Sequence, residues 1–180
     1  MKKNYEMDMC SGPILGKLLT FTIPLIFSGI LQLLFNAADV IVVGRFAGSQ
    51  SLAAVGSTTA LINLMINIFI GLSVGVNVIV ARYYGAKREK DVQDTIHTAM
   101  ALSIVSGLFL IILGQLLSRP MLELMGTPDD VIDKSTIYMR IIFIGMPANM
   151  IYNFGSAILR AVGDTKRPLY FLTAAGGVHG

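Results

Sequence analysis

The feature that most constrains this chain is a run of 21 residues, from Leu18 to Ala38, that carries no charged side chain. A helix of about 20 apolar residues is long enough to cross the hydrocarbon core of a bilayer. Further uncharged runs cover 46–81 and 141–159, and an apolar segment covers about 95–117. Because lipid offers the backbone no hydrogen-bond partner, segments of this length are expected to be helices. The predicted fold class is therefore all-α, a polytopic membrane helix bundle.

The uncharged runs predict four full transmembrane helices and a truncated fifth. The four cover about 18–43, 52–81, 95–117 and 128–159, the fifth begins at 168, and residues 1–17 form a polar arm. Thr127-Pro128-Asp129-Asp130 offers a cap, a proline and carboxylates that would start the fourth helix outside the membrane. Because the fifth helix stops too early to cross a bilayer, the 180-residue product is expected to be truncated, frameshifted or dependent on a partner.

Composition supports a membrane protein and argues against several other classes. Charged residues make up 14% of the chain, against about 25% in soluble domains. The chain has one cysteine and two isolated histidines, and it lacks a phosphate-binding glycine loop or a nucleophile–base pair. No metal site, cofactor or enzymatic activity is therefore predicted. The expected partners are the lipid bilayer and a small organic substrate, and nucleic acid is not among them.

Basic residues predict the orientation of the helices, because cytoplasmic loops are enriched in Lys and Arg. Ten of the 14 basic residues fall on one side of the predicted membrane and three on the other. The ten are Lys2, Lys3, Lys17, Arg82, Lys87, Arg88, Lys90, Arg160, Lys166 and Arg167. A multi-pass protein of the plasma membrane with a cytoplasmic N-terminus is therefore expected.

Three of the predicted helices carry a polar stripe on an otherwise apolar surface. Residues three or four positions apart share one face of a helix. Amides between membrane helices often only hydrogen-bond across an interface, so a packing role and a cavity-lining role both stay open. The cavity-lining candidates are Gln32, Asn36, Asn63, Asn67, Asn149 and Asn153.

Asp39 is the leading functional candidate. An ionisable residue inside a membrane is costly and usually handles an ion or a substrate. The alternative is a structural pair with Arg45 at the end of the helix. Pro24 removes a backbone hydrogen bond inside the first helix and is expected to bend it, as Pro147 is in the fourth. The Gly71-Leu72-Ser73-Val74-Gly75 segment matches a small-residue motif for close helix packing.

Several segments together resemble the multidrug and toxic compound extrusion (MATE) family of transporters. Each segment is weak alone, but their order and their spacing relative to the predicted helices are specific. The resemblance extends to about Ala175. The segments are Phe21-Thr22-Ile23-Pro24-Leu25, Phe35-Asn36-Ala37-Ala38-Asp39, Gly44-Arg45-Phe46-Ala47-Gly48, Leu52-Ala53-Ala54-Val55-Gly56, Arg82-Tyr83-Tyr84-Gly85-Ala86-Lys87 and Leu159-Arg160-Ala161-Val162-Gly163-Asp164-Thr165-Lys166-Arg167-Pro168.

The resemblance implies a fold and an activity. Members of the family have twelve helices in two six-helix lobes around a central cavity, so residues 1–180 would form part of the N-terminal lobe. They export organic, often cationic, compounds by alternating access, driven by inward flow of Na⁺ or H⁺. Asp39 matches the acidic residue implicated in cation coupling, and Pro24 matches the proline at which the first helix is proposed to bend.

Two alternatives stay open besides a cation-coupled exporter. One is a lipid-linked saccharide flippase of the same wider superfamily, which a cavity richer in Arg and Lys would favour. The other is a membrane fragment that does not transport or that pairs with a partner chain. The chain stops within the fifth helix, whereas the cation site of the family also uses residues of its fifth and sixth helices. A complete transporter would therefore need the missing C-terminal portion.

Overall fold

The protein is described by a computed structural model, in which residues 13–46 and 48–178 are described. Within these ranges the description leaves out the side chains of 39–40, 42–44, 46, 48–52, 57 and 175–178. No strand occurs in the described ranges, which confirms the predicted all-α class. The helices are α1 (Ile14–Phe46), α2 (Gly48–Gly85), α3 (Glu89–Leu124), α4 (Asp129–Ile144), α5 (Met146–Ala161) and α6 (Lys166–Val178).

The long helices have the length and composition needed to cross a membrane. Apolar spans occupy Ile14–Ala38, Ala53–Gly85 and Glu89–Leu124, and the bent pair α4–α5 supplies a fourth when counted as one. Helix α6 has 13 described residues, which rise only about 20 Å and cannot cross a bilayer alone. The described chain is thus a membrane helix bundle.

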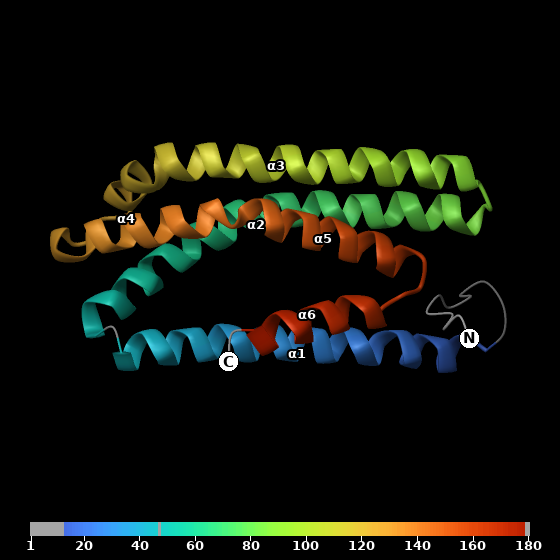
Figure 1. Ribbon diagram of the computed structural model, residues 1–180, viewed down its shortest axis with the longest axis horizontal. Helices are drawn as coiled ribbons and strands as arrows, with labels where there is room; N and C mark the ends of the chain where they lie inside the picture. The colour runs from blue at the N-terminus through green and yellow to red at the C-terminus, as the bar shows by residue number, and fades with distance from the viewer. Residues whose placement is uncertain (1–12, 47, 179–180) are drawn as a thin grey trace.

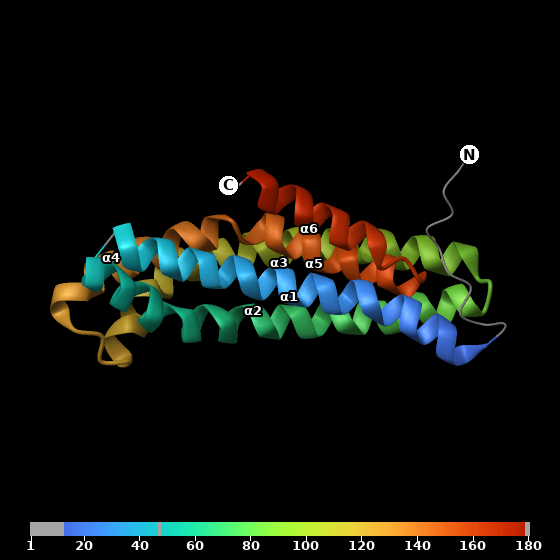
Figure 2. The same ribbon diagram turned by 90° about the horizontal axis from the view of Figure 1, so that it is seen from below.

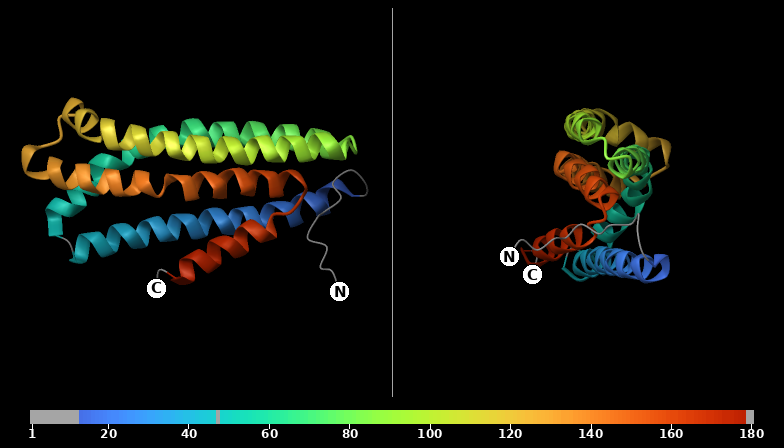
Figure 3. Two further views of the ribbon diagram at one scale, coloured as in Figure 1. Left: turned by 45° about the horizontal axis from the view of Figure 1, so that its top comes forward. Right: turned by 90° about the vertical axis from the view of Figure 1, so that its right-hand side faces the viewer.

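The helices form two groups that lie along a common long axis (Figure 1). Helices α2, α3, α4 and α5 contact one another, whereas α1 contacts α2 and α6. Figure 2 shows α6 beside α1, and the end-on view in Figure 3 shows this pair set apart from the other helices. The N-terminal end of α1 and the C-terminal end of α5 lie at the same end of the molecule (Figure 1).

The apolar core lies within the group of α2 to α5. Its fully buried side chains include Leu110 of α3, Phe143 of α4 and Phe154 of α5. Several buried hydroxyls within the helices do not need partners on other helices, because they bond to carbonyls of their own helix. Ser103 donates to the Met100 carbonyl at 2.7 Å, and Ser73 to the Ile70 carbonyl at 2.8 Å. Small residues whose hydroxyls bond to a carbonyl of their own helix allow helices to pack closely in lipid.

The fourth predicted helix, at 128–159, is two helices in the structure. Helix α4 ends at Ile144 and α5 begins at Met146, with a bend of 47° between them. The bend agrees with the expected effect of Pro147, which cannot donate a hydrogen bond to the preceding turn. The capping role predicted for Thr127 is wrong, because α4 has no side-chain cap and the Thr127 hydroxyl has no partner among the described residues.

Close helix packing occurs in α3 and not at the glycines predicted for it. Gly71 and Gly75 of α2 are exposed, and no described neighbouring atom lies within 4 Å of a Cβ built on either. A Cβ on Gly107 of α3 would instead lie 2.5 Å from the Pro147 Cα, and one on Gly114 would overlap the Phe143 ring. These two glycines receive the residues on either side of the bend, so α3 supports the α4–α5 break.

We predict that Gly107→Ala destabilises the helix bundle by about 1–3 kcal/mol, because its methyl group would meet the Pro147 backbone, which cannot turn aside. Loss of helical circular dichroism during denaturation of the reconstituted chain would measure the change. Gly71→Ala is the matched control. Its methyl group meets open space, and replacing a helical glycine with alanine is expected to stabilise by about 0.5–1 kcal/mol. Equal stability of the two variants would contradict the packing argument.

Candidate functional site

A cavity of about 650 Å³ lies between α1, α2 and α5. Polar and apolar side chains both line it, although all three helices are predominantly apolar. A volume of this size is in the range of sites for drug-sized molecules, about 300–1,000 Å³. The lining residues are Phe21, Leu25, Gln32 and Asn36 of α1, Asn63, Ile66, Ile70, Val74 and Asn77 of α2, and Asn149, Asn153, Ala157 and Arg160 of α5.

The structure brings together five of the six amides singled out in the sequence. They are Gln32, Asn36, Asn63, Asn149 and Asn153, which come from three helices. Asn67 is exposed and does not belong to the lining. Asn77 does belong to the cavity lining. The sequence analysis did not list it as a cavity candidate, although it falls in the same sector of α2 as Asn63. The sequence already places Asn77 in the polar stripe of this helix with Asn63, because 63 and 77 are separated by 14 residues, about four turns.

Two of the amides are held by hydrogen bonds. The Asn77 side-chain nitrogen donates to the Ala157 carbonyl at 2.7 Å and so joins α2 to α5. The Asn153 side-chain nitrogen donates to the Asn149 side-chain oxygen at 2.7 Å and to the Asn149 carbonyl at 2.9 Å. Donor groups of both residues are therefore engaged within the protein. The orientation that these bonds give Asn77 and Asn153 is set before any ligand enters.

Arg160 brings a positive charge into the cavity. It lies in the last turn of α5, is half-buried, and belongs to the lining. The sequence analysis placed Arg160 among the basic residues that follow the fourth span on the cytoplasmic side. The bend at Gly145 and the packing of α5 on α2 place it in the cavity wall. The position of Arg160 in the cavity wall depends on tertiary structure, and counting charges along the chain could not predict that position.

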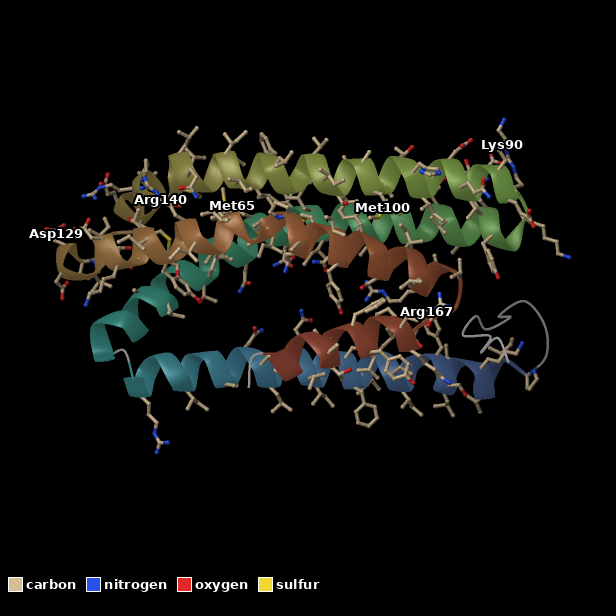
Figure 4. The ribbon with its side chains drawn as sticks, in the orientation of Figure 1. Met65, Lys90, Met100, Asp129, Arg140 and Arg167 are labelled. Atoms are coloured by element: carbon tan, nitrogen blue, oxygen red, sulfur yellow. The ribbon has the colours of Figure 1, made fainter. Side chains whose placement is uncertain are left out.

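Asp164 organises the turn that follows Arg160 and leads into α6. Its carboxylate is fully buried, and Oδ1 accepts hydrogen bonds from the backbone N–H groups of Lys166 and Arg167, each at 3.1 Å. A side-chain acceptor that bonds the N–H groups two and three residues further along the chain is the pattern of a helix N-cap. Oδ2 lies 3.1 Å from the Arg167 Nε in an ion pair whose angles do not make a hydrogen bond. The carboxylate charge is therefore committed to α6 and to Arg167, which Figure 4 labels.

The remaining sequence candidates lie in α1. Asp39 belongs to the helix, but its side chain is outside the described residues, so its surroundings are not described. Helix α1 continues from Ile14 to Phe46 through Pro24, and bending at this proline stays a prediction. In the described part of the chain no cluster of three or more His, Cys, Asp or Glu side chains could hold a metal ion.

Comparison with known proteins gives consistent matches along most of the chain. The family model MatE matches residues 24–179. The chain is 35% identical over 152 residues to a probable multidrug resistance protein, YoeA, of Bacillus subtilis, covering 84% of this chain and 33% of that protein. It is 27% identical over 168 residues to a FAD transporter of Shewanella oneidensis, covering 93% of this chain and 37% of that protein.

The fold also matches solved structures. The crystal structure of a MATE protein in complex with MaD3S superimposes with a TM-score of 0.83 at 27% identity, over 89% of this chain and 36% of that one. The chain thus spans about a third of the length of the relatives and structures that it matches.

We predict that Asp164→Ala lowers the stability of the α5–α6 turn by about 1–2 kcal/mol, because two backbone N–H groups lose their capping acceptor. Increased hydrogen exchange at Lys166 and Arg167 would detect this change. Asp94→Ala is the matched control, since Asp94 is an exposed carboxylate in α3, and it is expected to leave this turn unchanged. Unchanged exchange at Lys166 and Arg167 in Asp164→Ala would contradict the capping role.

Proposed function

The chain belongs to the MatE family, and on that premise we propose that it is part of a secondary transporter that exports organic compounds, driven by inward flow of Na⁺ or H⁺. The observation that carries this proposal is the polar cavity between α1, α2 and α5. Polar groups inside a membrane bundle are costly unless they pair or serve a pathway. A cavity lined by amides from three helices meets the requirements of a pathway for polar organic cargo.

Alternating access is proposed to involve movement of α1. This helix contacts α2 and α6 but none of α3, α4 and α5 among the described residues. Such a helix can move relative to the α2–α5 group without disrupting the buried core. A bend at Pro24 would change the wall of the cavity directly, because Phe21, Leu25, Gln32 and Asn36 of α1 all line it. Transport by a complete protein would also need the portion of the family fold beyond this chain.

Asp39 is proposed to couple the movement of a cation to the movement of α1. A carboxylate can bind Na⁺ or H⁺, and neutralising its charge lowers the cost of holding it within the membrane. Because Asp39 and Asn36 lie three residues apart on α1, they share a helix face. Cation binding at Asp39 would therefore act on the helix that forms one wall of the cavity.

The charge of the cargo does not follow from family membership. The Bacillus subtilis relative is named a probable multidrug resistance protein, which suits the expectation of cationic drugs. The Shewanella oneidensis relative is named a FAD transporter, and FAD carries negatively charged phosphates. Export of amphipathic organic compounds is the activity proposed for this chain. The residues that line the cavity would decide whether the exported compounds are cations or anions.

The proposed location is the plasma membrane, with the N-terminus in the cytoplasm. Lys90 lies at one end of the long axis and Asp129 at the other (Figure 4). The end that holds Lys90 also holds the α5–α6 turn with Lys166 and Arg167. An excess of basic residues at this end supports a cytoplasmic position for it.

Asp39→Asn in the complete transporter is expected to reduce ion-gradient-driven drug efflux to the level of cells without the transporter, because the amide cannot exchange a cation. Efflux of a fluorescent drug from energised cells measures the effect, with the amount of protein in the membrane measured in parallel. Asp129→Asn is the matched control, because Asp129 is an exposed carboxylate at a helix start. Normal efflux by Asp39→Asn would disprove the coupling role.

A topology reporter fused after Lys90 is expected to be active in the cytoplasm, and one fused after Asp130 outside the membrane. The physical reason is the excess of Lys and Arg in the α2–α3 and α5–α6 connections. Paired fusions to green fluorescent protein and alkaline phosphatase give opposite signals at the two sites. The reverse pattern would invert the orientation, and equal activity at both sites would contradict a single topology.

A further inference from the structure

The cavity wall carries a positive charge that nothing in the described protein compensates. Arg160 is the one charged residue in the lining, and no ion pair or hydrogen bond to its guanidinium occurs among the described residues. The nearest carboxylate along the chain, Asp164, is buried against the α6 backbone and paired with Arg167. Arg160 therefore faces the cavity without a counter-ion from this part of the protein.

Asp39 lies several helical turns along α1 from the first residue of the cavity lining. It lies 18 residues beyond Phe21 along α1, which corresponds to a rise of about 27 Å. Phe21 belongs to the N-terminal half of α1 and Asp39 to its C-terminal half, and the N-terminal end of α1 lies at the end of the molecule where α5 finishes (Figure 1). Asp39 on α1 and Arg160 on α5 thus belong to parts of the two helices that lie toward different ends of the bundle.

The alternative for an arginine near a helix end is to extend along the helix and place its charge in water. Arg82 has that character, since it is exposed in the last turn of α2 and is absent from the cavity lining. Arg160 differs because it is half-buried and lines the cavity beside Asn153, Ala157 and Asn77. Its guanidinium offers a planar set of donors that suits carboxylate, sulfonate or phosphate groups.

We propose that Arg160 binds an anionic group of the cargo, so that this cavity takes amphipathic organic anions. The inference rests on the proposed function, because it assumes that the cavity is the cargo pathway. Apolar side chains of α1 and α2, including Phe21, Leu25, Ile66 and Ile70, line the same space and would receive an aromatic or aliphatic body. The amides supply further polar contacts, and the volume of about 650 Å³ admits a drug-sized molecule.

Binding of FMN and riboflavin to the 180-residue chain in phosphatidylcholine nanodiscs tests the proposal. The two compounds share the flavin ring and differ by one phosphate group, and flavin fluorescence reports the binding of both. FMN is expected to bind about tenfold more tightly than riboflavin, the difference that one charge-assisted hydrogen-bonded pair provides. Equal affinities, or no detectable binding of FMN, would overturn the proposal.

Variants locate the phosphate preference at Arg160. Arg160→Gln is expected to remove the roughly tenfold preference for FMN and to change riboflavin affinity less than about twofold. Arg160→Lys, which keeps the charge, should retain part of the preference. Arg82→Gln removes a charge from the same end of the molecule but outside the cavity, and it should leave the preference intact. A preference that survives in Arg160→Gln, or disappears in Arg82→Gln, would overturn the assignment.

Competition on the unmodified chain separates the possible sources of the anionic group and does not depend on any variant folding. Glycerol phosphate is expected to displace FMN and to leave riboflavin bound. Displacement of FMN by short-chain phosphatidylglycerol, at concentrations where glycerol phosphate has no effect, would assign Arg160 to a lipid headgroup and overturn the cargo assignment. Failure of glycerol phosphate and of the lipid to displace FMN would also overturn it.

The anion site and the proposed function fail separately. If the complete transporter shows no gradient-driven efflux while the 180-residue chain still binds FMN more tightly than riboflavin, the transport proposal is rejected. An anion-binding cavity would remain. Intact efflux with no dependence of FMN binding on Arg160 would reject the anion site alone.

Discussion

The absence of hydrogen-bond partners in lipid is the constraint on which this structure depends. Backbone groups of the spanning segments are satisfied within helices, and buried hydroxyls such as that of Ser103 bond to carbonyls of their own helix. The same constraint acts on the side-chain amides, which cannot face lipid without cost. Six amide side chains of α1, α2 and α5 line one cavity, whereas Asn67 is exposed outside it.

The bundle combines a well-packed group of helices with a loosely attached pair. The core of α2, α3, α4 and α5 is tight enough that Gly107 and Gly114 leave no space for a Cβ. Helices α1 and α6 lie outside this core (Figure 3). The cavity lies where the two groups meet, so one wall belongs to α2 and α5 of the well-packed group and the other to α1. This arrangement suits a site whose shape changes while its binding residues on α2 and α5 keep their positions.

The two charged residues to which a role is proposed belong to different helices. Asp39 lies on α1 toward one end, and Arg160 lies on α5 toward the other. Asp164 holds the start of α6 beside Arg160 without neutralising it, because its carboxylate is occupied by Lys166, Arg167 and burial. The cation-coupling role proposed for Asp39 and the anion-binding role proposed for Arg160 would then belong to different helices of one pathway.

The sequence by itself determined the all-α membrane class, the long apolar segments and the polar stripes on three of them. These properties depend on local patterns: runs without charge, helical spacing of amides, and motifs that resemble the MATE family, to which the matched model assigns the chain. Tertiary structure decided the break at Gly145, the close packing at Gly107 and Gly114, the exclusion of Asn67 and the inclusion of Asn77 and Arg160 in the cavity. Periodicity identifies which residues share a face of one helix, but contact between helices depends on crossing angles and bends that no local pattern contains. Arg160 was counted from the sequence among the basic residues that follow the fourth span, and the packing of α5 against α2 places it in the lining of the cavity.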